Sequence, residues 1–125
     1  MAKYNSFEEM EVYQKALQFG VKVYKLTLTN EKIAKDYGLK DQITRAAVSI
    51  SNNIAEGFEY DNKKDFIKFL RYSKGSTGEV RNMLDLLVRI EFIEKDRYSF
   101  LYEKVSSLSK QLFGFIQYLK NYNNK

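Results

Sequence analysis

The sequence of 125 residues contains no histidine, no cysteine, no proline and no tryptophan. Without cysteine it has no disulfide, no thiol nucleophile and no thiolate metal site. Without histidine it has no Ser-His or Cys-His nucleophilic pair, no histidine-containing zinc site and no Glu-x-x-His di-iron site. Only carboxylate, lysine, tyrosine and hydroxyl chemistry remains, so we expect no enzymatic activity, no metal and no cofactor.

Long apolar runs are also missing from the sequence. No window approaches the ~20 apolar residues that a membrane-spanning helix needs. The first residues lack the apolar run that follows the positive charge of a signal peptide. We therefore expect a cytoplasmic protein with no membrane partner.

The absence of proline, with only six glycines, leaves few residues that would interrupt a helix. Apolar residues recur at alternating steps of four and three in four segments, a pattern typical of helices that pack at shallow angles. These four apolar seams are Val12, Ala16, Phe19, Val23 and Leu26; Leu39, Ile43, Ala46, Ile50 and Ile54; Phe66, Leu70, Ser73, Thr77, Val80, Leu84 and Leu87; and Leu101, Val105, Leu108, Leu112, Phe115 and Leu119. The short links Phe58–Asp61 and Glu91–Lys95 favour antiparallel neighbours. We expect an all-α, antiparallel up-down-up-down four-helix bundle in which residues 1–125 form a single domain.

Residues near the ends of these segments are types that often cap helices. Ser6 and Glu9 fit a capping box at the start of the first helix. Gly57 suits the position just after the second helix. We expect Asp61 or Asn62 to cap the third helix, and Asp96 to open the fourth.

A stripe of polar residues lies beside the apolar seam of the second predicted helix. It consists of Gln42, Arg45, Ser49, Asn52, Asn53 and Glu56. One interpretation is a satisfied polar network in which Arg45 pairs with Glu56 or Glu79, between helices or between subunits, because partly buried polar groups are usually paired. The other interpretation is a surface that contacts a ligand or RNA. The first interpretation is favoured.

The third predicted helix contains a cluster of small residues, Ser73, Gly75, Ser76 and Gly78. Glycine inside a helix costs ~1 kcal/mol relative to alanine, so two glycines need a reason. We expect close approach of a neighbouring backbone. The alternative is an anion site made by Gly and Ser N–H groups, but such sites need a loop or a helix N-terminus.

Positive charge exceeds negative charge, with 21 Lys and Arg against 16 Asp and Glu and a formal net charge of +5. Basic side chains gather on outer arcs of the first and third predicted helices, namely Lys15, Lys22, Lys25, Lys63, Lys64, Lys68, Arg71 and Lys74. A charge run is often only a solvated face. However, cations neutralise phosphates and aromatic rings stack on unpaired bases, and the chain has ten tyrosines. These eight residues are therefore candidate contacts to nucleic acid.

The first predicted helix has a second apolar arc, formed by Tyr13, Leu17, Tyr24 and Leu28. A helix with two apolar faces buries one of them against something else. We expect self-association.

Two runs carry a family resemblance. The first is Gln-Ile-Thr-Arg-Ala-Ala-Val-Ser-Ile-Ser-Asn-Asn-Ile-Ala-Glu-Gly at residues 42–57, and the second is Phe66-x-x-Phe69-Leu70 followed by Gly75-Ser76-x-x-Glu79. They resemble the patterns Q-x-x-R-A-A-x-S-I-x-x-N-I-A-E-G and F-x-x-F-L…G-S-x-x-E of the four-helix-bundle proteins found in intervening sequences of 23S rRNA genes. Many members of that family have a second Arg where this chain has Thr44, so one possible phosphate contact is missing here.

The resemblance implies a bundle that assembles into a ring, a homopentamer in the family, without enzymatic activity. A related branch, the accessory variability determinant of diversity-generating retroelements, is a basic ring that binds nucleic acid and a reverse transcriptase. The resemblance also marks residues that matter for packing, assembly or binding: Gln42, Arg45, Ser49, Asn53, Glu56, Gly57, Gly75, Ser76 and Glu79.

The leading interpretation is a non-enzymatic, homo-oligomeric bundle that binds structured RNA, or nucleic acid more generally, through basic outer surfaces. The alternative is an adaptor ring that engages a protein such as a reverse transcriptase, with nucleic acid held mainly by that partner. An enzyme would need a carboxylate pair such as Glu56 and Glu79 holding a metal. A salt bridge explains such a pair near Arg45 better.

Overall fold

The computed structural model describes residues 4–122, and every regular element in that range is a helix. A 3₁₀ turn, η1 (Phe7–Glu9), precedes five α-helices. They are α1 (Glu11–Thr29), α2 (Glu31–Lys35), α3 (Tyr37–Glu59), α4 (Lys63–Arg89) and α5 (Lys95–Tyr122). The all-α class expected from the sequence is confirmed for the described residues, which contain no strand.

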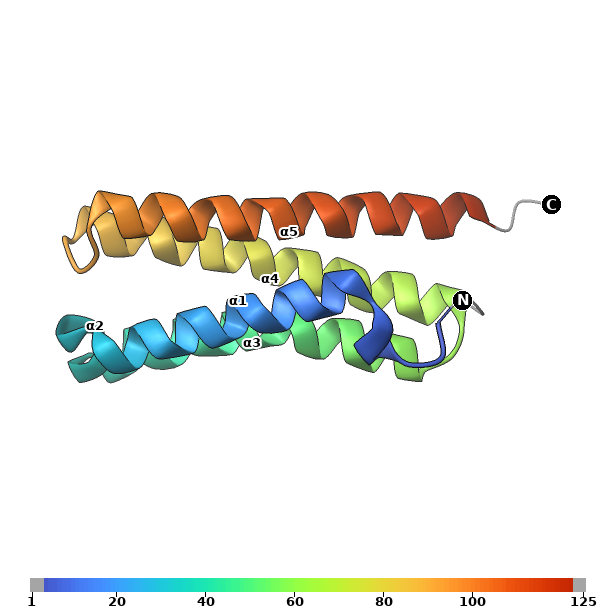
Figure 1. Ribbon diagram of the computed structural model, residues 1–125, viewed down its shortest axis with the longest axis horizontal. Helices are drawn as coiled ribbons and strands as arrows, with labels where there is room; N and C mark the ends of the chain where they lie inside the picture. Colours follow the sequence, from blue (N-terminus) through green and yellow to red (C-terminus); the bar gives the residue numbers. More distant parts are fainter. Residues whose placement is uncertain (1–3, 123–125) are drawn as a thin grey trace.

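The four long helices lie side by side along the long axis of the molecule (Figure 1). α1 packs against α3, α3 against α4, α4 against α5, and α5 against α1. The α3–α4 contact is the most extensive of the four and the α1–α5 contact the least extensive. No helix within residues 4–122 combines the length and the apolar character needed to cross a bilayer.

The predicted apolar seams form the core. All of the seam residues of α1 and α4 are buried, including the hydroxyl residues Ser73 and Thr77. In α3 and α5 the seams are also buried, except that Leu39 and Phe115 are only partly covered. Met10, Ile33 and Ile93 extend the core toward its two ends. Alternating steps of four and three therefore identified the inward faces correctly.

The first connection contains a short helix that the apolar pattern did not predict. α2 has only one buried residue, Ile33, so it has no repeating seam. Its N-cap is Asn30, whose side-chain oxygen accepts the Ile33 N–H at 3.0 Å. Asp36 then caps α3 by accepting the Leu39 N–H at 3.1 Å. Two capping side chains thus build a compact turn between α1 and α3.

Two of the predicted helix starts are wrong. Ser6 makes no side-chain capping bond, and Glu9 accepts the Asn5 N–H, because η1 separates this segment from α1. α5 begins at Lys95, so Asp96 lies in its first turn instead of opening it. The expected cap of α4 is confirmed as Asn62, whose side-chain oxygen accepts the Asp65 N–H at 2.8 Å.

Gly57 lies inside α3, so its predicted role as the residue after the helix is wrong. The helix continues to Glu59, and the reversal into α4 uses Asp61 in the left-handed region, with φ of 57°. Gly57 is buried where α4 crosses. A Cβ at this position would lie 2.6 Å from Phe69 Cβ and 3.1 Å from Phe66 Cδ1. The glycine is needed for close approach of the two helices.

α4 and α5 are joined by a hydrogen bond in which the Tyr98 hydroxyl donates to Asp85 Oδ1 at 2.5 Å. This bond is the largest cause of a pKa raised from 10.0 to about 12 for Tyr98, and burial and the negative charge of Asp85 act in the same direction. The bond stabilises the neutral form of the Tyr98 hydroxyl, because ionisation would place two negative charges side by side.

We expect Gly57→Ala to destabilise the chain. Phe69 Cβ is fixed to the backbone, so relieving the 2.6 Å overlap requires α3 and α4 to move apart. Overpacking of this kind costs ~1–3 kcal/mol, partly offset by the ~1 kcal/mol helix preference of alanine. Thermal denaturation followed by circular dichroism measures the effect.

The matched control is Gly75→Ala, in the exposed part of α4, where an added Cβ would meet nothing within 4 Å. It should raise the melting temperature through helix propensity alone. Equal stabilisation by both substitutions would contradict the close approach at Gly57.

We also expect the Tyr98–Asp85 bond to stabilise the fold in a pH-dependent way. Since the pKa of Tyr98 rises on folding from 10.0 to about 12, this contribution is complete below pH 10 and is lost as the pH rises through 12. Tyr98→Phe should therefore lower the urea midpoint at neutral pH, and its difference from wild type should shrink between pH 10 and 12. Tyr24→Phe, at an exposed tyrosine, is the control. A difference that does not change with pH would show that the bond is unimportant.

Candidate nucleic-acid interface

The first half of α4 carries a basic face. Its members are Lys63, Lys64, Lys68, Arg71 and Lys74, of which Lys63 and Lys74 are half-buried and the other three are exposed. Steps of three and four place Lys64, Lys68 and Arg71 on one side of the helix. None of the five forms an ion pair with a described residue. The ion pairs among residues 4–122 are Lys15–Glu11 and Arg45–Asp41. Their charges are free to act on a ligand.

Aromatic side chains lie beside this basic face. Tyr60 stacks on Phe69 with ring centroids 5.0 Å apart and an interplanar angle of 13°, and Tyr72 meets the edge of Phe69 at 5.5 Å. Lys68 Nζ lies 5.4 Å from the centre of the same ring. Tyr60 and Tyr72 are both about half exposed, so rings and cations share one surface. The sequence places Tyr72 one residue after Arg71, but it gives no signal that Tyr60, at the end of α3, would join it.

The three candidate lysines of α1 differ in their contacts. Lys15 pairs with Glu11 at 3.5 Å, and Lys22 Nζ lies 5.8 Å from the centre of the Phe100 ring of α5. Lys25 is exposed and makes neither kind of contact with the described residues. Because α1 does not pack against α4, these lysines form a surface separate from the basic face of α4.

Part of the polar stripe joins α3 to α4. Asn53 Nδ2 donates to the carbonyl and the hydroxyl oxygen of Ser49, both at 2.8 Å. The Ser76 hydroxyl of α4 donates to Ser49 Oγ at 2.9 Å, and the buried Ser73 hydroxyl donates to the Ile50 carbonyl at 2.7 Å. Of the six residues in the predicted stripe, only Ser49 and Asn53 take part in this network, and Gln42, Arg45, Asn52 and Glu56 are exposed.

The expected pairing of Arg45 with Glu56 or Glu79 within the chain is wrong. Arg45 Nε binds Asp41 Oδ2 at 2.9 Å, one helical turn earlier on the same helix. Residues four apart on one helix are neighbours, so Arg45 can pair with Asp41 without a contribution from another helix. Glu56 and Glu79 are exposed, as is Gln42, and pairing between subunits stays a prediction. No group of three or more His, Cys, Asp or Glu residues in the described range could hold a metal.

The expectation of a close backbone approach at Gly75 and Gly78 is also wrong. A Cβ at Gly75 would meet nothing within 4 Å, and one at Gly78 would meet only Arg81 Nη2 at 3.7 Å. The hydrogen bonds between α3 and α4 come from Ser73 and Ser76, and the close approach of the two helices occurs at Gly57. No contact among residues 4–122 explains Gly75.

The second apolar arc of α1 remains uncovered. Its members Leu17, Tyr24 and Leu28 are 42–54% exposed, and Val21, which the prediction left out, joins them at 46%. Tyr37 of α3, beside Tyr24, is 81% exposed. Tyr13 differs, because it is half-buried with its ring 4.9 Å from that of Phe7. The arc leaves a continuous apolar surface along one side of α1.

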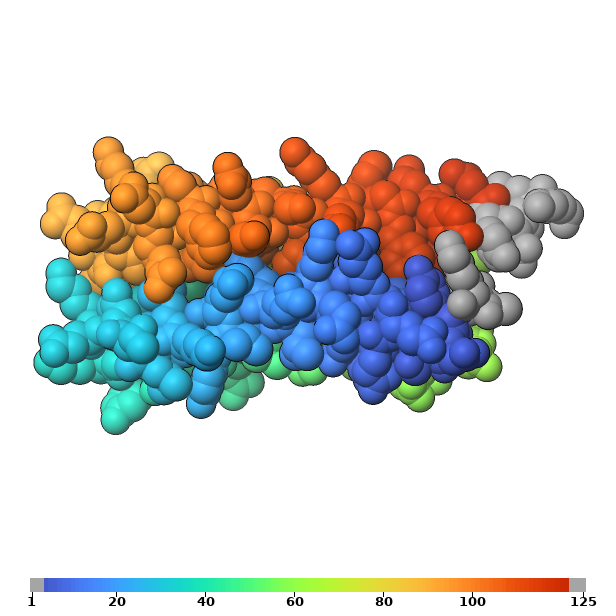
Figure 2. Space-filling view, viewed as in Figure 1, coloured from blue at the N-terminus to red at the C-terminus, as the bar shows by residue number. Residues whose placement is uncertain are grey.

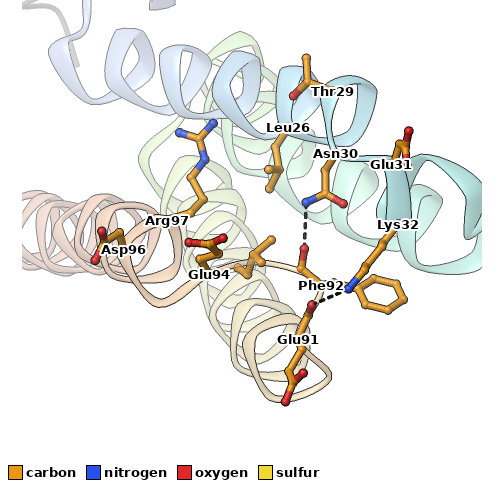
Figure 3. A pocket seen from close by; sticks show the side chains of 11 residues that line it. Leu26, Thr29, Asn30, Glu31, Lys32, Glu91, Phe92, Glu94, Asp96 and Arg97 are labelled. Atoms are coloured by element: carbon orange, nitrogen blue, oxygen red, sulfur yellow. Dashed lines mark hydrogen bonds between the residues drawn. The ribbon is translucent and has the colours of Figure 1, made fainter.

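A cavity of about 570 Å³ lies between the α1–α2 junction and the α4–α5 connection (Figure 3). Asn30 Nδ2 donates to the Phe92 carbonyl at 2.8 Å and Lys32 Nζ to the Glu91 carbonyl at 3.2 Å, so both side chains span the junction. Its lining has four carboxylates, Glu31, Glu91, Glu94 and Asp96, against Lys32 and Arg97. This excess of negative charge does not suit phosphate.

Comparison with known proteins gives a match to a family model and similarity to solved structures. A family model described as 23S rRNA-intervening sequence protein matches residues 8–114. The chain is also similar to a crystal structure of a protein with unknown function from the S23 ribosomal protein family of Bacteroides thetaiotaomicron, with 28% identity and a TM-score of 0.76. That similarity covers 85% of this chain and 95% of the other. No protein with a curated description matches.

Proposed function

Since the chain belongs to the family of 23S rRNA-intervening sequence proteins, we propose that it is a non-enzymatic, homo-oligomeric helical bundle that binds structured RNA, or nucleic acid more generally. The observation that carries this proposal is the basic face of α4, whose five cations have no described ion-pair partner. Unpaired cations on a rigid helix can neutralise phosphates without first breaking a salt bridge.

The aromatic cluster next to this face supports the same function. Unpaired bases of a loop or a bulge stack on exposed aromatic rings, and stacking is worth ~1–3 kcal/mol per base. Tyr60 and Tyr72 offer exposed rings beside Lys68. A structured RNA presents phosphates and unpaired bases together, which matches this combination.

Assembly is the second part of the proposal. The four long helices form an up-down-up-down bundle, supported by the short α3–α4 and α4–α5 connections and by the course of the chain in Figure 1. The uncovered arc of Leu17, Val21, Tyr24 and Leu28 is the surface on which copies associate into a ring, for which a pentamer is the expected size. Repetition of a weak basic face around a ring raises the affinity for one long ligand.

An adaptor is the second candidate function. The same apolar arc, with the exposed Arg45, Glu56 and Glu79, suits a protein partner such as a reverse transcriptase. A reverse transcriptase gene beside the coding gene favours the adaptor, whereas an open reading frame inside an rRNA gene favours RNA binding.

The test reverses three charges on the basic face, in the variant Lys64→Glu, Lys68→Glu, Arg71→Glu. All three side chains are exposed, so the fold should survive. Binding of a structured RNA is measured over a salt series by fluorescence anisotropy. Each lost phosphate contact lowers the log–log salt slope by ~0.7–0.9, so we expect weaker binding with a slope smaller by about 2 to 3.

The matched control reverses three other exposed lysines, in the variant Lys35→Glu, Lys95→Glu, Lys110→Glu. This control changes the net charge by the same amount as the first variant, but at positions outside the basic face of α4. Equal losses in the two variants would mean that only net charge matters. Unchanged affinity and slope in the first variant would show that the basic face of α4 is not the binding surface.

A further inference from the structure

The α1–α5 seam is the least tightly packed contact between long helices, and three cavities lie along it. Figure 2 shows this face of the molecule, where side chains of α1 in blue meet those of α5 in orange and red. The middle cavity, of about 160 Å³, is lined by both helices. We name it the α1–α5 groove.

The α1–α5 groove is lined by cations and neutral polar groups with no carboxylate. Its polar residues are Lys15, Gln18 and Lys22 from α1, and Lys104, Ser107 and Gln111 from α5. The acidic cavity near Asn30 lies at one end of the seam, so the seam is positive only in its middle. Of these three positive charges only Lys15 has a carboxylate partner, the exposed Glu11, so the groove favours an anionic ligand.

Two of these lysines converge from opposite helices on one ring. Lys22 Nζ lies 5.8 Å and Lys104 Nζ 5.3 Å from the centre of the Phe100 ring, and neither forms an ion pair with a described residue. The ring offsets part of their repulsion. Lys15 has only the exposed Glu11 as a partner, a kind of pair that is worth little and exchanges readily for a ligand.

The spacing of the lysines suits a strand that runs along the seam. Lys15 and Lys22 are seven residues apart in α1, which is about 10 Å along the helix axis. A cleft between two packed helices admits a single strand and excludes a duplex. Two phosphates of one extended strand can therefore meet Lys15 and the Lys22–Lys104 pair.

Gln111 supplies an acceptor in the same groove. Its side-chain oxygen is buried and accepts no hydrogen bond from a described residue. A buried acceptor without a partner costs free energy. Rotation of the Gln111 side-chain amide would turn this oxygen toward the groove, where a donor on a ligand can bind it. A ribose 2′-hydroxyl is such a donor, and deoxyribose has none.

We propose that the α1–α5 groove binds the sugar–phosphate backbone of an unpaired RNA segment, with Lys15, Lys22 and Lys104 on phosphates and Gln111 on a 2′-hydroxyl. This inference rests on the proposed RNA-binding function and adds a second site to it, apart from the basic face of α4. Lys104 has no place among the residues marked by the family resemblance. The site depends on the packing of α1 beside α5, because each helix supplies part of its lining.

The test uses a fluorescein-labelled oligouridylate and measures anisotropy over a salt series. The groove variant is Lys22→Gln, Lys104→Gln, and the matched control is Lys35→Gln, Lys110→Gln, with one exposed lysine removed from α2 and one from α5. Loss of two phosphate contacts lowers the slope for a single strand by about 1.4, so we expect that fall in the groove variant and not in the control. Circular dichroism verifies that both variants fold.

A second arm tests the role of Gln111. Wild-type protein should bind oligouridylate more tightly than oligodeoxyuridylate, and Gln111→Met should remove that preference while keeping the salt slope. Equal binding of RNA and DNA by wild-type protein, or equal slopes in the groove and control variants, would overturn the groove site while leaving the basic face of α4 standing. No RNA binding by wild-type protein would overturn the proposed function and the groove site together.

Discussion

The close approach of α3 and α4 at Gly57 is the contact on which the rest of the structure depends. Any side chain at this position would overlap Phe69 and Phe66. Because glycine has none, the aromatic start of α4 can lie directly on the end of α3. Farther along the same pair, Ser73 and Ser76 donate hydrogen bonds to Ile50 and Ser49. This is the most extensive helix contact in the fold, and it fixes which face of α4 points outward.

The outward faces follow from that contact. Because Ser73 and Ser76 of α4 are turned toward α3, the lysines of α4 and Arg71 are left toward the outer surface without described acidic partners. At the opposite seam, α1 and α5 meet less closely, and Lys22 and Lys104 come together over Phe100. One face offers separate cations beside aromatic rings, and the other offers a narrow polar groove. They suit different parts of one RNA molecule.

Much of the fold could be predicted from the sequence, because the buried seams repeat with a period set by the helix itself. Contacts that occur at a single position, without a repeating pattern, were harder to predict. Gly57 looked like a helix end because glycine often follows helices, but only the crossing of α4 shows why it is buried. The sequence pattern predicts Glu56 or Glu79 as the partner of Arg45, but Asp41 lies one turn away and takes that place. The lysines of α4 could be foreseen as an outer face, whereas Lys104 could not, since nothing in the sequence says which side of α5 meets α1.

The most direct test of this account is the binding of wild-type protein to a structured RNA over a salt series, with duplex DNA and an acidic polypeptide as controls. The account predicts a preference for the RNA and an affinity that falls steeply with salt, by ~0.7–0.9 log units per log unit of salt for each phosphate neutralised. Absence of binding at low salt, or equal binding to all three polyanions, would contradict it. The excess of positive charge would then be only a solvated surface.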